Sequence, residues 1–375
     1  MWDLPPKKAT IKTDDVTKSD GNPRNSEGAF LRLKDGRIVY VYSRYRGDSC
    51  HDHAYCEIAA IYSGDEGETF SEPEILFVPR LEEQYDETNM MSVSLLRMQN
   101  GDIGVFYLLK RHNIVCELNM RRSSDELKTF SEPVRCVGDT PGYYEVNNDR
   151  VIRTSSGRLI VPAAKYQSEI GYYGPVNDFI DPRSCVAFFA SDDDGYTWRR
   201  ISGMISLYGG GYSNTGFQEP GVVELAPGLL YAYFRTDLGR QYESISIDGG
   251  SEWTMPQPSR FTSPYSPMQI KQNPYSGKFY AIWNPVPKYF GKPLASIWTG
   301  GRSPLVIAEG EFGANGISWG EPRIIEEDPR AGFCYPSVMY LSEKEALLAY
   351  CAGSAEFGDE NCLTRVRIRK IGLES

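Results

Sequence analysis

The chain has 375 residues, a net charge of −10 and 13% aromatic residues. The negative charge argues against nucleic acid as a partner, and no run approaches the roughly 18 apolar residues of a membrane span. The first residues, Met1 to Pro6, lack the apolar core of a signal peptide. We therefore expect a cytoplasmic protein, or a secreted or periplasmic one if a leader has been removed.

An apolar strand, a short turn and a second apolar strand recur six times, usually with Gly at the turn. In chain order the copies span 30–42, 93–107, 151–163, 222–233, 268–283 and 338–350. Their spacing of roughly 50 to 70 residues is close to what one four-stranded propeller blade and its loops need. The repeat covers nearly the whole chain, so we expect one all-β domain over residues 1–375. We also expect a terminal strand, at about 362–371, to pair into the N-terminal blade and close the ring.

A smaller motif, Ser-x-Asp-x-Gly-x-Thr-Trp/Phe, follows most of these strand pairs. It is complete at 63–70 and 191–198, lacks the Gly at 123–130 and the Thr at 246–253, and survives in part at 316–319. Ser and Asp side chains bond nearby backbone amides, and Gly accepts a positive φ, so the motif predicts a closed hairpin turn.

No cofactor or metal is expected. The run Asp192 to Asp194 lacks the remaining ligands of a calcium loop, and His51 and His53 have no identifiable third ligand. The eight cysteines show no zinc-ribbon spacing, so we interpret them as reduced, small buried residues.

The chain has only three histidines, which makes a Ser-His-Asp triad improbable. Arg, Tyr and carboxylate residues instead stand just outside the repeated strands. In a propeller these strand ends line the central face, where ligands bind.

The five boxes, in this phase with the strand pairs, resemble the Asp-box (BNR) repeats of the sialidase superfamily, in a divergent branch. The resemblance implies a six-bladed β-propeller that hydrolyses a terminal α-linked sialic acid or a related 2-keto acidic sugar. It also implies a Tyr nucleophile activated by a Glu, because the anomeric carboxylate would repel a carboxylate nucleophile. Three Arg would hold that carboxylate, and an Asp would protonate the leaving oxygen.

Matching positions give the nucleophile Tyr335, its base Glu219 and the acid/base Asp52, with Asp48 as second choice. The three arginines that would hold the carboxylate are Arg24, Arg235 and Arg302. The family's Glu after the sixth strand pair has no counterpart in Tyr350 to Gly353, and Glu27 is a candidate to brace an Arg in its place.

Further substrate contacts are expected from polar residues near the same strand ends. Gln218 stands beside Glu219, and Asn148 and Asp149 belong to the polar stretch 147–150 at the start of the third repeat. Weaker candidates for the pocket wall are Met90, Met91, Ser92, Tyr143, Tyr144 and Gln241.

Two other functions stay open. The propeller could be a glycosidase or uronate-acting enzyme for another sugar, or a carbohydrate-binding propeller without catalysis. Each candidate also has a structural interpretation, such as an Arg that caps a strand or a Tyr that closes a blade. We expect a sialylated or other acidic glycan as partner, and the sequence leaves the oligomeric state open.

Overall fold

Antiparallel β-strands build the computed structural model, which describes residues 11–81, 87–111, 115–137, 142–169, 179–207, 213–286, 301–328, 330–354, 358–359 and 361–374. These ranges contain no helix, which confirms the predicted all-β class. Accordingly, no helix in the described part of the chain is long and apolar enough to cross a membrane.

All six predicted strand pairs are present as antiparallel neighbours. They are β2 (Asn25–Arg32) with β3 (Ile38–Tyr45), β6 (Glu87–Arg97) with β7 (Ile103–Arg111), β11 (Ile152–Arg153) with β12 (Leu159–Glu169), β15 (Gln218–Ala226) with β16 (Leu229–Arg235), β19 (Gln269–Gln272) with β20 (Phe279–Trp283), and β24 (Ala331–Tyr340) with β25 (Glu345–Ser354).

Further strands extend each pair into a group, which we number by the order of the pairs in the chain. Hydrogen bonds join the first three groups into one 13-stranded sheet, and the fourth, fifth and sixth groups are separate sheets of four, five and four strands. They are β4 (Cys56–Ser63) and β5 (Glu74–Phe77), β8 (Val115–Ser123) and β9 (Val134–Arg135), β10 (Tyr143–Glu145), β13 (Phe179–Ser191) and β14 (Arg199–Arg200), β17 (Arg240–Ser246) and β18 (Gln257–Thr262), β21 (Leu305–Gly313), β22 (Gly316–Trp319) and β23 (Arg323–Glu326), and β26 (Arg365–Gly372) with β1 (Ile11–Val16).

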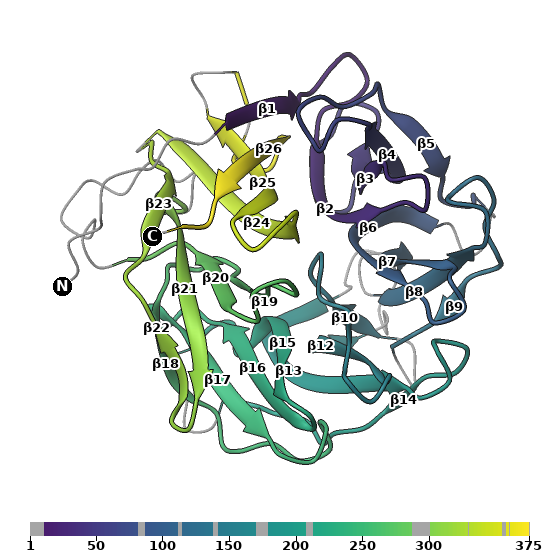
Figure 1. Ribbon diagram of the computed structural model, residues 1–375. Coiled ribbons are helices and arrows are strands. Elements are labelled where there is room, and N and C mark those ends of the chain that lie inside the picture. The colour runs from purple at the N-terminus through teal and green to yellow at the C-terminus, as the bar shows by residue number, and fades with distance from the viewer. Residues whose placement is uncertain are drawn as a thin grey trace.

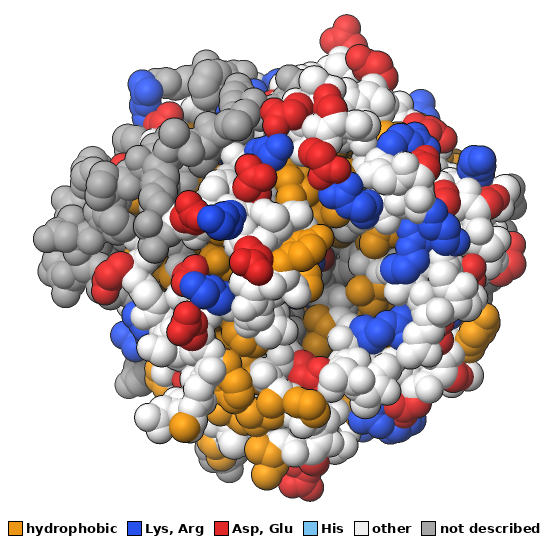
Figure 2. Space-filling view, viewed as in Figure 1, with side chains coloured by type: hydrophobic (Ala, Val, Ile, Leu, Met, Phe, Trp, Pro, Cys, Tyr) orange, Lys and Arg blue, Asp and Glu red, His pale blue; other side chains and the backbone are white. Residues whose placement is uncertain are grey.

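The groups follow one another around a common centre, as in a β-propeller (Figure 1). Strands such as β2, β15, β19 and β24 lie toward this centre, and β5, β14 and β18 lie at the outside. On the face shown in Figure 2, acidic and basic side chains are interspersed over the rim, and the surface is hollowed near the middle.

The hydrophobic core is divided among the interfaces between neighbouring groups. One cluster joins the first and second groups through residues such as Val41, Ile58 and Val105. Another joins the sixth and first groups through Tyr40, Ala59, Leu347 and Ile368. Apolar packing is therefore continuous across the junction where the two ends of the chain meet.

The prediction that the C-terminal strand closes the ring by joining the N-terminal group is wrong. β26 pairs with β25 inside the last group, and the N-terminal strand β1 adds to its outer side. Two ion pairs support this arrangement, because Asp15 lies 3.0 Å from Arg367 and 3.8 Å from Arg365. The N-terminal strand therefore completes the C-terminal group.

The Ser-x-Asp motifs form the predicted hairpin turns. In the third group, Ser191 Oγ donates to Asp193 Oδ1 and accepts the Gly195 N–H, each at 2.7 Å. Asp193 in turn accepts the Thr197 N–H at 2.8 Å, and the Trp198 indole donates to the Gly195 carbonyl at 3.1 Å. Equivalent Ser–Asp bonds recur at Ser63, Ser123 and Ser246.

All eight cysteines are free thiols, and only Cys185 is not fully buried. This confirms their interpretation as mostly small buried residues.

Candidate active site

The same backbone irregularity occurs in the first strand of several groups. Glu27, Ser92, Glu219 and Tyr335 have φ values of 20°, 58°, 42° and 55°, and each falls at a register shift with the neighbouring strand. A non-glycine residue pays on the order of 1 kcal/mol or more for such a conformation, and a bulge re-aims the side chain. All four residues line one pocket. The strained backbone positions therefore belong to the same site.

Tyr335 and Glu219 form the centre of this site. The Tyr335 hydroxyl donates to Glu219 Oε1 at 2.7 Å. The other carboxylate oxygen lies 2.5 Å from Nη1 of Arg235, and both members of this ion pair are buried. The Arg235 guanidinium also stacks 3.5 Å from the ring centroid of Tyr265. Glu219 is therefore fixed between a cation and the phenol.

Burial, followed by the Glu219 carboxylate, raises the pKa of Tyr335 well above its ordinary value, against the opposing effect of Arg235 and Arg302. The phenol is consequently neutral in the resting site. It can become a nucleophile only by passing its proton to a base in contact with it, and Glu219 is in that position.

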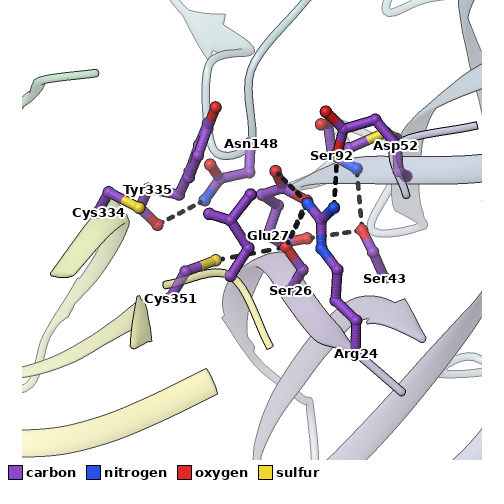
Figure 3. Close-up of polar contacts among 12 residues, drawn as sticks. Arg24, Ser26, Glu27, Ser43, Asp52, Ser92, Asn148, Cys334, Tyr335 and Cys351 are labelled. Atoms are coloured by element: carbon purple, nitrogen blue, oxygen red, sulfur yellow. Dashed lines mark hydrogen bonds and ion pairs between the residues drawn. The ribbon is translucent and has the colours of Figure 1, made fainter. Parts of the chain in front are cut away.

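Arg24 joins two carboxylates on the other side of the site (Figure 3). Its Nη1 lies 2.5 Å from Asp52, and its Nη2 lies 3.3 Å from Glu27, which also accepts the Ser26 hydroxyl at 2.7 Å. Arg24 is 1% exposed, whereas the Asp52 side chain is 57% exposed. Asp48, the second choice for the acid, is exposed and does not line the pocket.

The two carboxylates near Arg24 have opposite pKa shifts. Partial desolvation opposes ionisation of Asp52, but the charges of Arg24 and Lys110 outweigh it and hold the pKa of that carboxyl well below its ordinary value. At Glu27, burial outweighs the attraction of Arg24 and raises the pKa. Asp52 is therefore the carboxyl of the pair that loses its proton more readily in the unliganded site.

Arg302 lies near Tyr335 but belongs neither to the ion pair of Arg235 with Glu219 nor to the ion pairs of Arg24. Its guanidinium carbon is 5.4 Å from the Tyr335 ring centroid, and its Nη1 contacts Cys334 Sγ at 3.2 Å and Cys362 Sγ at 3.7 Å. A hydrogen bond from Cys334 and the charge of Arg302 lower the pKa of Cys362 to about 6. Two thiol groups therefore contact this arginine where a carboxylate would be its usual partner.

Three predicted sugar contacts are bonded to residues of other groups. Asn148 donates to the Gly28 carbonyl at 2.9 Å, and Asp149 pairs with Lys271 at 2.6 Å. Gln218 donates to the Pro182 carbonyl at 2.9 Å and accepts the Tyr265 hydroxyl. None of the three is among the residues that line the pocket. Two of these contacts link groups that are not neighbours, because Asn148 and Asp149 at the start of the third group bond the first and the fifth group.

The pocket is lined by side chains from several groups. They are Glu27, Asp52, Met91, Ser92, Leu108, Lys110, Cys116, Tyr143, Glu145, Asn147, Glu219 and Tyr335. Of the weaker candidates for the wall, Met91, Ser92 and Tyr143 are included, and Met90, Tyr144 and Gln241 are not.

Sequence reasoning missed Lys110 and Glu145, although both carry charge into the pocket. For Glu145, the alternation of an extended segment is the signal that could have identified it, because residues 143, 145 and 147 fall on one side of such a segment. Glu145 accepts the Tyr166 hydroxyl at 2.5 Å. Burial, followed by the nearby charge of Glu219, raises the pKa of Glu145 to about 7.

A family model described as the BNR repeat-like domain matches residues 72–346. The chain belongs to the BNR repeat-like family. Its predicted place in the sialidase and Asp-box superfamily is thereby confirmed.

One characterised relative of this BNR repeat-like chain is the anhydrosialidase of Macrobdella decora. The two are 27% identical over 204 residues, which is 52% of this chain and 23% of the leech protein. The alignment therefore spans less than a quarter of that relative's length.

Solved structures share the fold at low sequence identity. The NanB sialidase of Streptococcus pneumoniae has a TM-score of 0.65 and 14% identity, over 99% of this chain and 71% of that one. The Hadza microbial sialidase Hz136 has a TM-score of 0.70 and 17% identity, over 94% and 66%. A protein of unknown function from Dyadobacter fermentans has a TM-score of 0.66 and 16% identity, over 96% and 98%. These likenesses support a sialidase-like propeller fold.

Proposed function

We propose that the protein is an exo-α-sialidase-like glycosidase that releases a terminal α-linked sialic acid, or a related 2-keto acidic sugar, with retention of configuration. The observation that carries the proposal is the 2.7 Å hydrogen bond from Tyr335 to Glu219, whose other oxygen is held by Arg235. The sialidases among its relatives and structural neighbours support the same class of reaction.

In this proposal Tyr335 attacks the anomeric carbon while Glu219 takes its proton. A neutral phenol approaches a carbon that bears a carboxylate without the repulsion that an Asp or Glu nucleophile would meet. Asp52, which has given its proton to the leaving oxygen, then takes a proton from water, and the water oxygen displaces Tyr335 from the anomeric carbon. Two displacements at one carbon restore the starting configuration. The proton returns from Glu219 to the phenol.

The substrate carboxylate is received by Arg24, Arg235 and Arg302, through charge-assisted hydrogen bonds. Arg24 is paired with Asp52 in the unliganded site. A substrate carboxylate that binds Arg24 competes for its N–H groups and adds a negative charge nearby. Both effects raise the pKa of Asp52, so substrate binding converts an exposed anion into a group able to protonate the leaving oxygen.

The architecture proposed with this function is one propeller domain whose six strand groups are its six blades. The blades then bring Asp52 from the first, Glu219 from the fourth and Tyr335 from the sixth to one pocket. Arg24 and Arg235 are paired with two of these carboxylates, Asp52 and Glu219.

The decisive experiment compares fluorophore release from an α-linked N-acetylneuraminic acid glycoside by the wild type, Tyr335→Phe and Tyr196→Phe. Tyr196 is 58% exposed and serves as the matched control. We expect turnover by the wild type and the control, and a loss of at least about 10³-fold in Tyr335→Phe. A folded wild type without turnover would refute the assignment of substrate.

Kinetics of the variant Arg302→Ala test whether the substrate carries an anomeric carboxylate. In the proposal Arg302→Ala raises KM by at least about tenfold, because one charged hydrogen-bond partner of the carboxylate is lost. Near-normal KM and kcat in that variant would favour a glycosidase for another sugar.

A further inference from the structure

A cluster of cysteines lies beside Tyr335 and takes no part in the proposed reaction. Cys334 immediately precedes Tyr335 in the chain (Figure 3), and it packs in one buried cluster with Cys351 and Cys362. Nη1 of Arg302 donates to the sulfur of Cys334 at 3.2 Å and to the sulfur of Cys362 at 3.7 Å. Two sulfur atoms therefore share one cation.

The guanidinium of Arg302 depends on these sulfur atoms. The backbone carbonyl of Arg302 accepts the N–H of Phe333 at 2.8 Å, which fixes the residue against β24. Its Nε is buried and lacks a hydrogen-bond partner among the residues that the structure describes. A cation removed from water needs a compensating partner, and a thiolate at either sulfur would supply a negative charge in contact with it.

The surroundings of the thiols make one of them different from the others. A hydrogen bond from Cys334, together with the charge of Arg302, lowers the pKa of Cys362 to about 6. Burial raises the pKa of Cys351 to about 12, and it raises the pKa of Cys185 as well. Because the thiolate is the nucleophilic form of cysteine, Cys362 is the reactive sulfur, and Cys334 is the second thiol in contact with it.

We propose that Cys334 and Cys362 form a peroxide-reactive dithiol, and that its oxidation to a disulfide releases Arg302 to bind a carboxylate. The dithiol is independent of the proposed function, whereas its effect on an acidic sugar rests on that function. In the reduced state the sulfur of Cys362 competes with the sugar carboxylate for the N–H groups of Arg302. A disulfide carries no charge and its sulfur atoms are weak acceptors, so oxidation ends this competition.

The oxidation consumes one molecule of hydrogen peroxide. The Cys362 thiolate attacks one peroxide oxygen, the O–O bond breaks, and the departing hydroxide takes back the proton that Cys362 had lost to solvent. The Cys334 thiol then attacks the sulfur of the resulting sulfenic acid. Its proton leaves with the hydroxyl as a second water, and the S–S bond forms. Two thiols thereby lose two electrons, which reduce the peroxide to water.

The test treats the wild type, Cys362→Ser and Cys185→Ser with hydrogen peroxide and maps the products by mass spectrometry of peptides. We expect a disulfide between Cys334 and Cys362 in the wild type and in Cys185→Ser, and none in Cys362→Ser. Dithiothreitol should reverse it. Cys185 is the matched control, because it is the only one of the eight cysteines that is not fully buried, so accessibility alone would select it.

Two further measurements complete the test. Cys334→Ser removes the second thiol and should stop the oxidation at the sulfenic acid of Cys362. Calorimetry measures binding of the methyl α-glycoside of N-acetylneuraminic acid to Tyr335→Phe, a background in which no ligand is consumed. We expect the oxidised protein to bind at least about threefold more tightly than the reduced protein, and peroxide to leave the affinity of Tyr335→Phe/Cys362→Ser unchanged.

The outcomes separate this inference from the proposed function. If the disulfide does not form, or peroxide oxidises Cys185 before Cys362, the dithiol is refuted whatever the activity of the enzyme. If the disulfide forms and the glycoside binds equally in both states, the release of Arg302 is refuted and the proposed function is unaffected. If the disulfide forms but the glycoside is neither bound nor turned over, the proposed function fails and the dithiol stands.

Discussion

At the scale of single residues, the buried pair of Glu219 and Arg235 decides the properties of the site. Both side chains are at most 6% exposed, and their nearest atoms are 2.5 Å apart. A buried carboxylate is tolerated because a cation compensates it, and the loss of one partner leaves an uncompensated charge. The stability of the fold and the reactivity of Tyr335 therefore depend on the same contact.

Arg235→Met should lower the free energy of unfolding by about 3–5 kcal/mol. Arg199→Met is the matched control, because Arg199 is 60% exposed in its pair with Asp192, and such pairs contribute at most about 1 kcal/mol. Urea unfolding measures both. Adding Glu219→Gln should restore much of the loss; a double variant no more stable than Arg235→Met would contradict the account.

Glu145 makes stability depend on pH. Its pKa is raised from 4.5 to about 7, so between these values the folded chain holds a proton that the unfolded chain releases. Its contribution to stability therefore falls as the pH rises through this window, by up to about 1.4 kcal/mol per pH unit. Glu145→Gln should flatten the curve between about pH 5 and about pH 7. Parallel wild-type and variant curves, measured by urea unfolding, would show that Glu145 does not titrate there.

At the scale of elements, the strand pairs and their Ser-x-Asp turns follow directly from local sequence. Alternating apolar residues define each strand, and Ser–Asp bonds close the turns without help from distant residues. Glu145 and Lys110 could not be found in the same way. Alternation places residue 145 on the same side as residues 143 and 147. That this side and Lys110 face one pocket depends on how several groups meet, which the local sequence does not show.

Ser191→Ala should destabilise the protein by about 1–3 kcal/mol, because the buried N–H of Gly195 loses its acceptor. Ser251 stands in the equivalent turn of the fourth group and is exposed, so Ser251→Ala should have an effect near zero. Thermal unfolding of both variants tests the comparison. Equal midpoints for the two would argue against the turn as a stabilising element.

At the scale of the whole molecule, the two ends of the chain meet in one group. β1 pairs with β26, and apolar packing continues from the sixth group to the first. The direction of this closure could not be predicted, because β1 reads Ile-Lys-Thr-Asp-Asp-Val and lacks the apolar alternation that fixes register. Its pairing depends on backbone bonds and on Asp15, whose arginine partners come from the opposite end of the chain.

A chain that starts at Thr17 should therefore unfold at a lower temperature than the full chain, yet still in one transition, since the interfaces between the groups remain. Calorimetry gives both the midpoint and the number of transitions. An unchanged midpoint would show that β1 contributes nothing to closure.

The central claim is that Tyr335 attacks the sugar. Its most direct test is the mass of the enzyme after reaction with a 2-keto acidic sugar that carries a good leaving group and a neighbouring fluorine, which slows hydrolysis of the intermediate. The account predicts one covalent sugar on the peptide that contains Tyr335, and none in Tyr335→Phe. An adduct on Glu219 or Asp52, or turnover of the normal substrate by Tyr335→Phe at the wild-type rate, would contradict it.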